Sequence, residues 1–93
     1  MLNQCVLAGR IFEIDGNVLK IATTRYYKNE NGEYDTDIIS CKISENIAKQ
    51  AKEFCKKGDF IGIKARIETE DENIIIIAEK LTLLNSKQED GEK

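Results

Sequence analysis

The order of the predicted elements restricts the fold of this chain more than any other feature of its sequence. Five runs rich in β-branched and aliphatic residues are separated by turn signals, and one amphipathic helical segment lies between the third run and the fourth. The chain has no proline, so its turns depend on glycine, asparagine and aspartate. The predicted strands are residues 4–14, 18–27, 34–43, 60–68 and 74–84. The predicted turns and loops between them are residues 15–17, 28–33 and 69–73.

The fourth predicted strand shows the period of two that is typical of a half-buried strand. Its outward positions include Lys64 and Arg66, and its inward positions are all apolar. The inward residues are Ile61, Ile63, Ala65 and Ile67. One face of this strand is therefore expected to pack into a core while the other presents two cations.

The helical segment has clear signals at both ends. Ser44 is a good N-cap, and the segment is expected to end at the run Lys56, Lys57 and Gly58, which places cations and a glycine at the C-terminal end. One apolar stripe is expected to pack into the core, with lysines on the opposite face. The stripe consists of Ile47, Ala48, Ala51, Phe54 and Cys55.

Five strands with one helix between the third and the fourth match the OB-fold, a mainly β, five-stranded Greek-key barrel whose second and third strands offer a binding face. A small sandwich of a mixed sheet and a helix is the competing architecture. We expect residues 1–84 to form the single domain, and residues 85–93 to form a flexible polar tail because they contain too few apolar residues to fold alone.

Composition argues against several functional classes. The chain has no histidine and only three cysteines, which are widely spaced, so we expect no metal site, no cofactor and no disulfide framework. The lack of histidine also removes the commonest general base, and we do not expect an enzyme. No apolar run approaches the roughly 20 residues that span a bilayer, so no membrane association and a cytoplasmic location are expected.

Four segments together resemble the bacterial single-stranded DNA-binding proteins. They are MLNQCVLAGRI, TTRYYKNENGEYDTDIISC, ENIAKQAKEFCKKGD and IGIKARI. The resemblance extends from Met1 to about Leu84. It implies an OB-fold protein of DNA replication, recombination or repair that binds single strands without sequence preference.

In this family, bases stack on aromatic rings and phosphates lie along basic side chains. The resemblance thus implies that the aromatic candidates for stacking are Tyr26, Tyr27 and Tyr34, with Phe12 better suited to the core or an interface. The cationic candidates for phosphate contact are Arg10, Arg25, Lys28, Lys42, Lys64 and Arg66. Contact with four to six phosphates would give a logarithmic salt slope of about −3 to −4.

The resemblance also implies a homo-oligomer, a tetramer or a dimer, in which the first strand of one subunit pairs with its counterpart in another. The expected interface residues are Asn3, Gln4, Cys5 and Val6. Pairing of two such edges would protect an exposed strand.

Several features depart from the family pattern. The chain has no tryptophan, and Ile38 and Ser44 stand where the family has aromatic residues. The turn at 69–73 is shorter than the usual hairpin, the tail lacks the apolar acidic tip that recruits replication and repair enzymes, and the net charge is −3. These departures keep two alternatives open: a primosome-like or other accessory OB protein that mainly docks replication proteins, and a protein-interaction domain with no nucleic-acid role.

Overall fold

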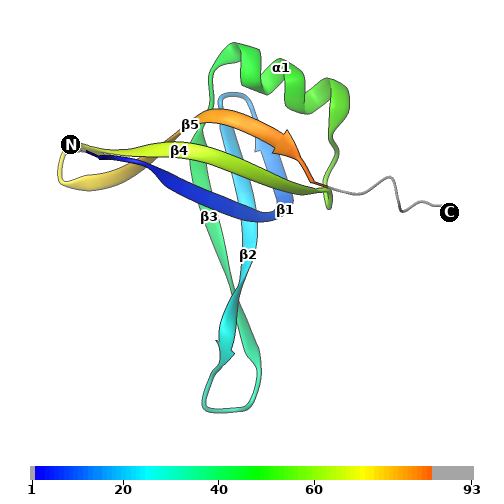
Figure 1. Ribbon diagram of the computed structural model, residues 1–93, viewed down its shortest axis with the longest axis vertical. Helices are drawn as coiled ribbons and strands as arrows, with labels where there is room; N and C mark the ends of the chain where they lie inside the picture. Colours follow the sequence, from blue (N-terminus) through cyan, green and yellow to red (C-terminus); the bar gives the residue numbers. More distant parts are fainter. Residues whose placement is uncertain (1, 85–93) are drawn as a thin grey trace, which may run out of the picture.

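Five strands form a closed barrel with one helix across its end (Figure 1). The computed structural model describes residues 2–84. Neighbouring strands follow the order β1-β2-β3-β5-β4 around the barrel, which confirms the predicted OB-fold. The elements are β1 (Cys5–Asp15), β2 (Val18–Lys28), β3 (Tyr34–Lys42), α1 (Glu45–Phe54), β4 (Phe60–Glu70) and β5 (Asn73–Leu83). The predicted tail at 85–93 lies outside the described residues.

Strand β1 has two different neighbours along its length. Residues 5–10 pair with β4, and residues 10–15 pair with β2. Gly9 lies where β1 passes from one partner to the other, and a Cβ atom at this position would lie 2.4 Å from the carbonyl oxygen of Ala22. The barrel can therefore close only because β1 and β2 approach each other without a side chain between them.

Alternating residues of the strands supply the core. Inward side chains of β1, β2 and β4 make up most of the buried core, and α1 adds a short apolar stripe. The largest buried side chains are Ile11, Leu19, Ile21, Ile61 and Ile63. The predicted alternation of β4 is correct as far as Ala65, but Ile67 is 39% exposed because β4 and β5 continue past the packed barrel as a hairpin.

The predicted helix start is correct, but its last turn differs from the prediction. The backbone N–H of Ile47 donates to Ser44 Oγ at 3.2 Å, as expected of an N-cap. The helix ends at Phe54, and Cys55 adopts an extended conformation with φ −130°. Phe54 is 67% exposed, so its assignment to the core was wrong. The buried residues of α1 are Ile47, Ala48 and Ala51, and Cys55, just past the helix, is partly buried against the core.

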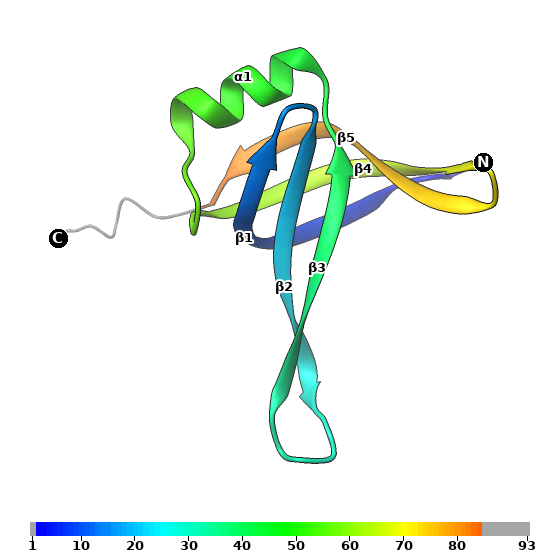
Figure 2. The same cartoon turned by 180° about the vertical axis from the view of Figure 1, so that it is seen from behind.

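Strands β2 and β3 extend well beyond the barrel as a twisted hairpin, which projects below the rest of the molecule in Figures 1 and 2. We call residues 24–36 the arm. Regular pairing runs to Thr24 and Thr36, is interrupted by an irregular stretch, and resumes where Lys28 faces Tyr34.

By contrast, β4 and β5 are joined by a tight turn, in which Asp71 and Glu72 have φ values of 52° and 70°. The short turn expected at 69–73 is confirmed.

We expect Gly9→Ala to destabilise the fold by about 1–3 kcal/mol, because the new methyl group would collide with the backbone of Ala22 and with the buried side chain of Ile21. Urea unfolding monitored by circular dichroism measures the effect. Gly62→Ala is the matched control, because the tightest contact of its Cβ would be 3.2 Å, to the flexible end of the Leu84 side chain. Equal stability of the two variants would contradict the close approach.

The thiol of Cys41 is expected to react slowly with iodoacetamide at pH 8. Its burial in the barrel raises its pKa from 9.0 to about 11, so little of the reactive thiolate forms. Cys5 is only partly buried and should be alkylated first. Mass spectrometry of the digested protein distinguishes the sites, and faster labelling of Cys41 than of Cys5 would show that this part of the barrel opens readily.

Candidate nucleic-acid interface

Four neighbouring strands place one outward residue each in a single row. Arg10 of β1 lies opposite Phe60 of β4 on one side and opposite Ala22 of β2 on the other. Ala22 in turn lies opposite Ile38 of β3. Ile11, Ile21 and Ile61, which directly follow or precede Arg10, Ala22 and Phe60, are buried in the core, so the row faces outward. We call Phe60, Arg10, Ala22 and Ile38 the sheet row. It places a cation among aromatic and aliphatic groups.

Arg10 is held in a defined position within the sheet row. Its guanidinium carbon lies 5.6 Å from the centre of the Phe60 ring, and its Nη1 donates to the carbonyl oxygen of Gly58 at 3.0 Å. The sequence analysis missed Phe60. The alternation of β4 identified the inward residues of this strand, but it did not indicate that Phe60, the first residue of β4, would contact Arg10. The missing signal was the pairing with β1, which joins residues about 50 positions apart.

A groove of about 460 Å³ opens beside Arg10, where β1 turns away from β2. Thr24 and Thr36 lie opposite each other on its arm side, and both are exposed. The groove is lined chiefly by Ala8, Arg10, Ala22, Thr24, Thr36 and Phe60. It therefore combines small apolar side chains, two hydroxyl groups, one aromatic ring and one cation.

The arm brings together the three tyrosines predicted from the sequence. Tyr26 is 92% exposed, and its ring lies 5.2 Å from that of Tyr27 at an angle of 84°. Across the hairpin, the Lys28 ammonium lies 5.8 Å from the centre of the Tyr34 ring. Residues Tyr34, Thr36 and Ile38 alternate along one side of β3, so the Lys28–Tyr34 pair continues the outward face of the sheet row.

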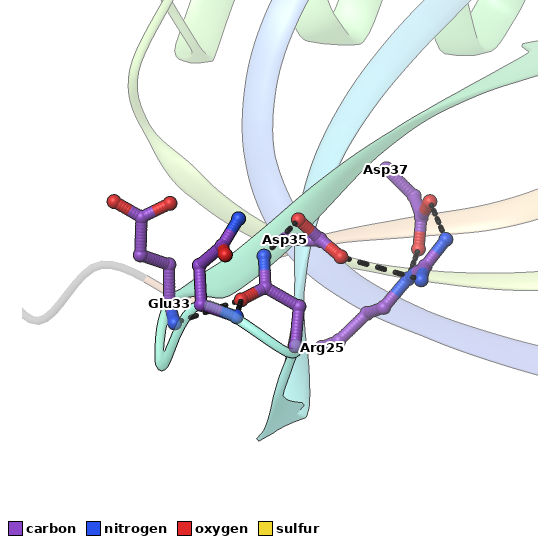
Figure 3. Close-up of polar contacts among 6 residues, drawn as sticks. Arg25, Glu33, Asp35 and Asp37 are labelled. Atoms are coloured by element: carbon purple, nitrogen blue, oxygen red, sulfur yellow. Dashed lines mark hydrogen bonds and ion pairs between the residues drawn. The ribbon is translucent and has the colours of Figure 1, made fainter.

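The opposite side of the arm carries an ion-pair network (Figure 3). Arg25 donates from Nε and Nη2 to the two carboxylate oxygens of Asp37, both at 2.9 Å, and its Nη1 lies 3.6 Å from Asp35. The side-chain amide of Asn29 donates to Asp35 at 3.0 Å, and its oxygen accepts the backbone N–H groups of Asn31 and Glu33. The network stiffens the arm and balances the charge of Arg25 with two carboxylates.

Lys42 and Arg66 are brought together on a different wall of the barrel. Each lies opposite Ile77 of β5, from β3 and β4 respectively. Arg66 contacts Glu68 at 2.7 Å and Glu79 at 3.1 Å, and Lys42 lies 3.7 Å from Glu70. Acids therefore outnumber these two cations.

Within residues 2–84, the predicted cations that form no ion pair with a carboxylate are Arg10, Lys28 and Lys64.

The predicted oligomer interface begins with a residue that is already engaged within the chain. The side chain of Asn3 donates to the carbonyl oxygen of Ile67 at 2.7 Å and accepts its N–H at 2.9 Å, which extends the pairing of β1 with β4. Gln4 is exposed, Cys5 is half-buried and Val6 is 76% exposed. In the part of the chain that the structure describes, no strand pairs with the other edge of β1 before Arg10.

No cluster of three or more potential metal ligands occurs between residues 2 and 84. None of the helical structure in that range is long and apolar enough to cross a membrane.

Comparison with known proteins assigns the chain to a family. Residues 2–74 match the model of the single-strand binding protein family, and the chain belongs to that family. It is 30% identical over 112 aligned positions to single-stranded DNA-binding protein 1 of Lactococcus lactis, covering 100% of this chain and 75% of the relative. It is 29% identical over 80 positions to single-stranded DNA-binding protein B of Bacillus subtilis, covering 74% and 70%.

Solved structures support the fold. The mitochondrial single-stranded DNA-binding protein Rim1 of Saccharomyces cerevisiae aligns with a TM-score of 0.68 at 15% identity, covering 88% of this chain and 93% of Rim1. A small single-stranded DNA-binding protein of Mycoplasma pneumoniae aligns with a TM-score of 0.63 at 22% identity, covering 94% and 90%. The family assignment predicted from the four sequence segments is confirmed.

The ion pair on the arm should be visible in the titration of Asp37. The hydrogen bonds from Arg25 lower the pKa of this carboxyl below its ordinary value of 3.8. The pair therefore contributes fully above pH 3.8 and is lost as the pH falls below that value. Carbon-detected NMR of the carboxyl follows the titration, and Arg25→Gln should return the pKa upward. An unchanged pKa in that variant would show that the pair does not persist in solution.

Proposed function

We propose that this protein binds single-stranded DNA without sequence preference and performs no catalysis. The observation that carries the proposal is the alignment of two cation–aromatic pairs, Arg10–Phe60 and Lys28–Tyr34, along one outward face of the sheet and arm. Aromatic rings stack on any base, and cations beside them attract the phosphates. Membership in the single-strand binding protein family and the names of the relatives support the same reading.

The proposed binding path runs from the arm to the sheet row. Three exposed tyrosines offer rings to successive bases, and the positive charge comes from Arg10, Lys28 and Lys64, which have no carboxylate partner within residues 2–84. Because Arg25, Lys42 and Arg66 are balanced by carboxylates, fewer phosphates are neutralised than the sequence alone suggested. Three contacts give a logarithmic salt slope of about −2.

We also propose the setting in which this binding occurs. The protein acts in replication, recombination or repair in the cytoplasm, and residues 1–84 form its single domain. The unpaired edge of β1 and the exposed Val6 support a homo-oligomer, a dimer or a tetramer, in which two β1 edges pair across a twofold axis. Gln4, Cys5 and Val6 would form this contact, while Asn3 fixes the start of β1 against β4.

Fluorescence anisotropy of a labelled oligo-thymidine tests the proposal directly. We expect binding at low salt, a slope near −2 as salt increases, and much weaker binding to a duplex of equal length. Duplex bases are already stacked on each other and are not accessible to the tyrosines. A protein that binds neither strand at low salt would contradict the proposal.

Tyr34→Leu should weaken binding to oligo-thymidine by about 5- to 150-fold, which corresponds to the roughly 1–3 kcal/mol of one stacked base. Phe54→Leu is the control, because Phe54 is a similarly exposed ring on α1, away from the arm. Circular dichroism confirms that both variants are folded. Equal affinities for the two variants would remove Tyr34 from the binding path.

A second candidate function is a docking module for another replication protein. It is favoured by large apolar side chains that lie exposed outside the sheet row and the arm, among them Phe54 and Ile74. Replacement of all three tyrosines by leucine separates the two functions. Retained binding to a replication protein after this replacement would favour docking, whereas strong binding of oligo-thymidine by the unmodified protein would favour the leading proposal.

A further inference from the structure

We propose that the groove beside Arg10 is a nucleotide subsite, which holds one base of a single strand while Arg10 contacts the adjacent phosphate. This inference rests on the proposed function and adds a site that the tyrosines of the arm do not supply. Its residues come from β1, β2, β3 and β4, which only the closed barrel brings together.

The size and surface of the groove suit a base. Its volume of about 460 Å³ lies within the roughly 300–1,000 Å³ of small-molecule sites. Ala8 and Ala22 contribute small apolar side chains, and Gly9, which adjoins Ala8 on β1, contributes backbone without a side chain. A flat ring can therefore lie against the floor without displacing a large side chain, and Phe60 forms one wall.

Arg10 is prepared to receive a phosphate. Its contact with the Phe60 ring and its hydrogen bond to the Gly58 carbonyl fix the guanidinium beside the groove. A guanidinium carries five N–H donors, and the described structure gives one hydrogen bond from Arg10, so donors remain for a phosphate. Arg25 and Arg66 differ, because each already gives hydrogen bonds to carboxylates.

The polar groups of the groove are compatible with any base. Thr24 and Thr36 lie opposite each other, and a hydroxyl group can donate or accept a hydrogen bond as the base edge requires. The two threonines thus provide polar contacts without selecting one base. This matches a protein that binds without sequence preference.

The groove continues the path from the arm. Tyr34, Thr36 and Ile38 follow one side of β3, and Tyr34 and Ile38 are about 13 Å apart along an extended strand. A single strand that stacks on Tyr34 can therefore reach the groove within a short span.

Two variants test the subsite in the full chain. Ala22→Leu fills the groove without removing a polar group, and Phe60→Leu removes its aromatic wall. We expect each to weaken oligo-thymidine binding at least fivefold in the anisotropy assay. Phe54→Leu is the matched control for Phe60→Leu and should bind like the wild type. Urea unfolding shows that the variants remain folded under the binding conditions.

Cross-linking gives a readout that does not depend on the variants. Oligo-thymidine with 5-iodouracil is irradiated with the wild-type protein, and mass spectrometry locates the attached peptides. Attachment to the segment containing Phe60, as well as to the arm, supports the subsite. If the wild type binds but attachment is confined to the arm and both groove variants bind like Phe54→Leu, the subsite is wrong, and single-strand binding then rests on the arm and its Lys28–Tyr34 pair. Absence of wild-type binding would overturn both.

Discussion

The close approach of β1 and β2 at Gly9 is the constraint on which the rest of the structure depends. Since no side chain lies between the strands there, β1 can leave β2 and pair with β4 along its first half. That change of partner closes the barrel, buries the inward isoleucines of three strands and opens the groove on the outside. The core and the candidate interface thus arise from the same backbone feature.

The distribution of carboxylates decides which cations are available to contact phosphates. A net charge of −3 does not favour a nucleic-acid-binding protein, yet the acids are not evenly placed. They form ion pairs with Arg66 and Lys42 on one wall of the barrel, and with Arg25 on the side of the arm opposite the Lys28–Tyr34 pair. The sheet row and the outer side of the arm keep Arg10 and Lys28 beside aromatic rings, and this face carries the proposed function.

Local patterns predicted the elements well and their outer contacts poorly. The period of two, the Ser44 N-cap and the turn residues gave five strands and one helix within a few residues of their observed bounds. Phe54 was assigned to the core because it continues the helical spacing of the apolar residues. At this last residue of α1, however, the side chain no longer packs against the barrel. Phe60 was missed because its partner Arg10 is remote in sequence.

The sequence by itself determined the element order, because alternation, capping and turn chemistry are properties of neighbouring residues. The resemblance of four segments to a known family indicated the family and favoured the barrel over the sandwich. It also identified the three tyrosines, which lie close together along the chain. Only the tertiary structure decided which cations are balanced by acids, and which residues of four strands share the sheet row. Strand pairing brings these residues together. Because the paired residues are far apart in the sequence, local sequence patterns do not reveal the contacts.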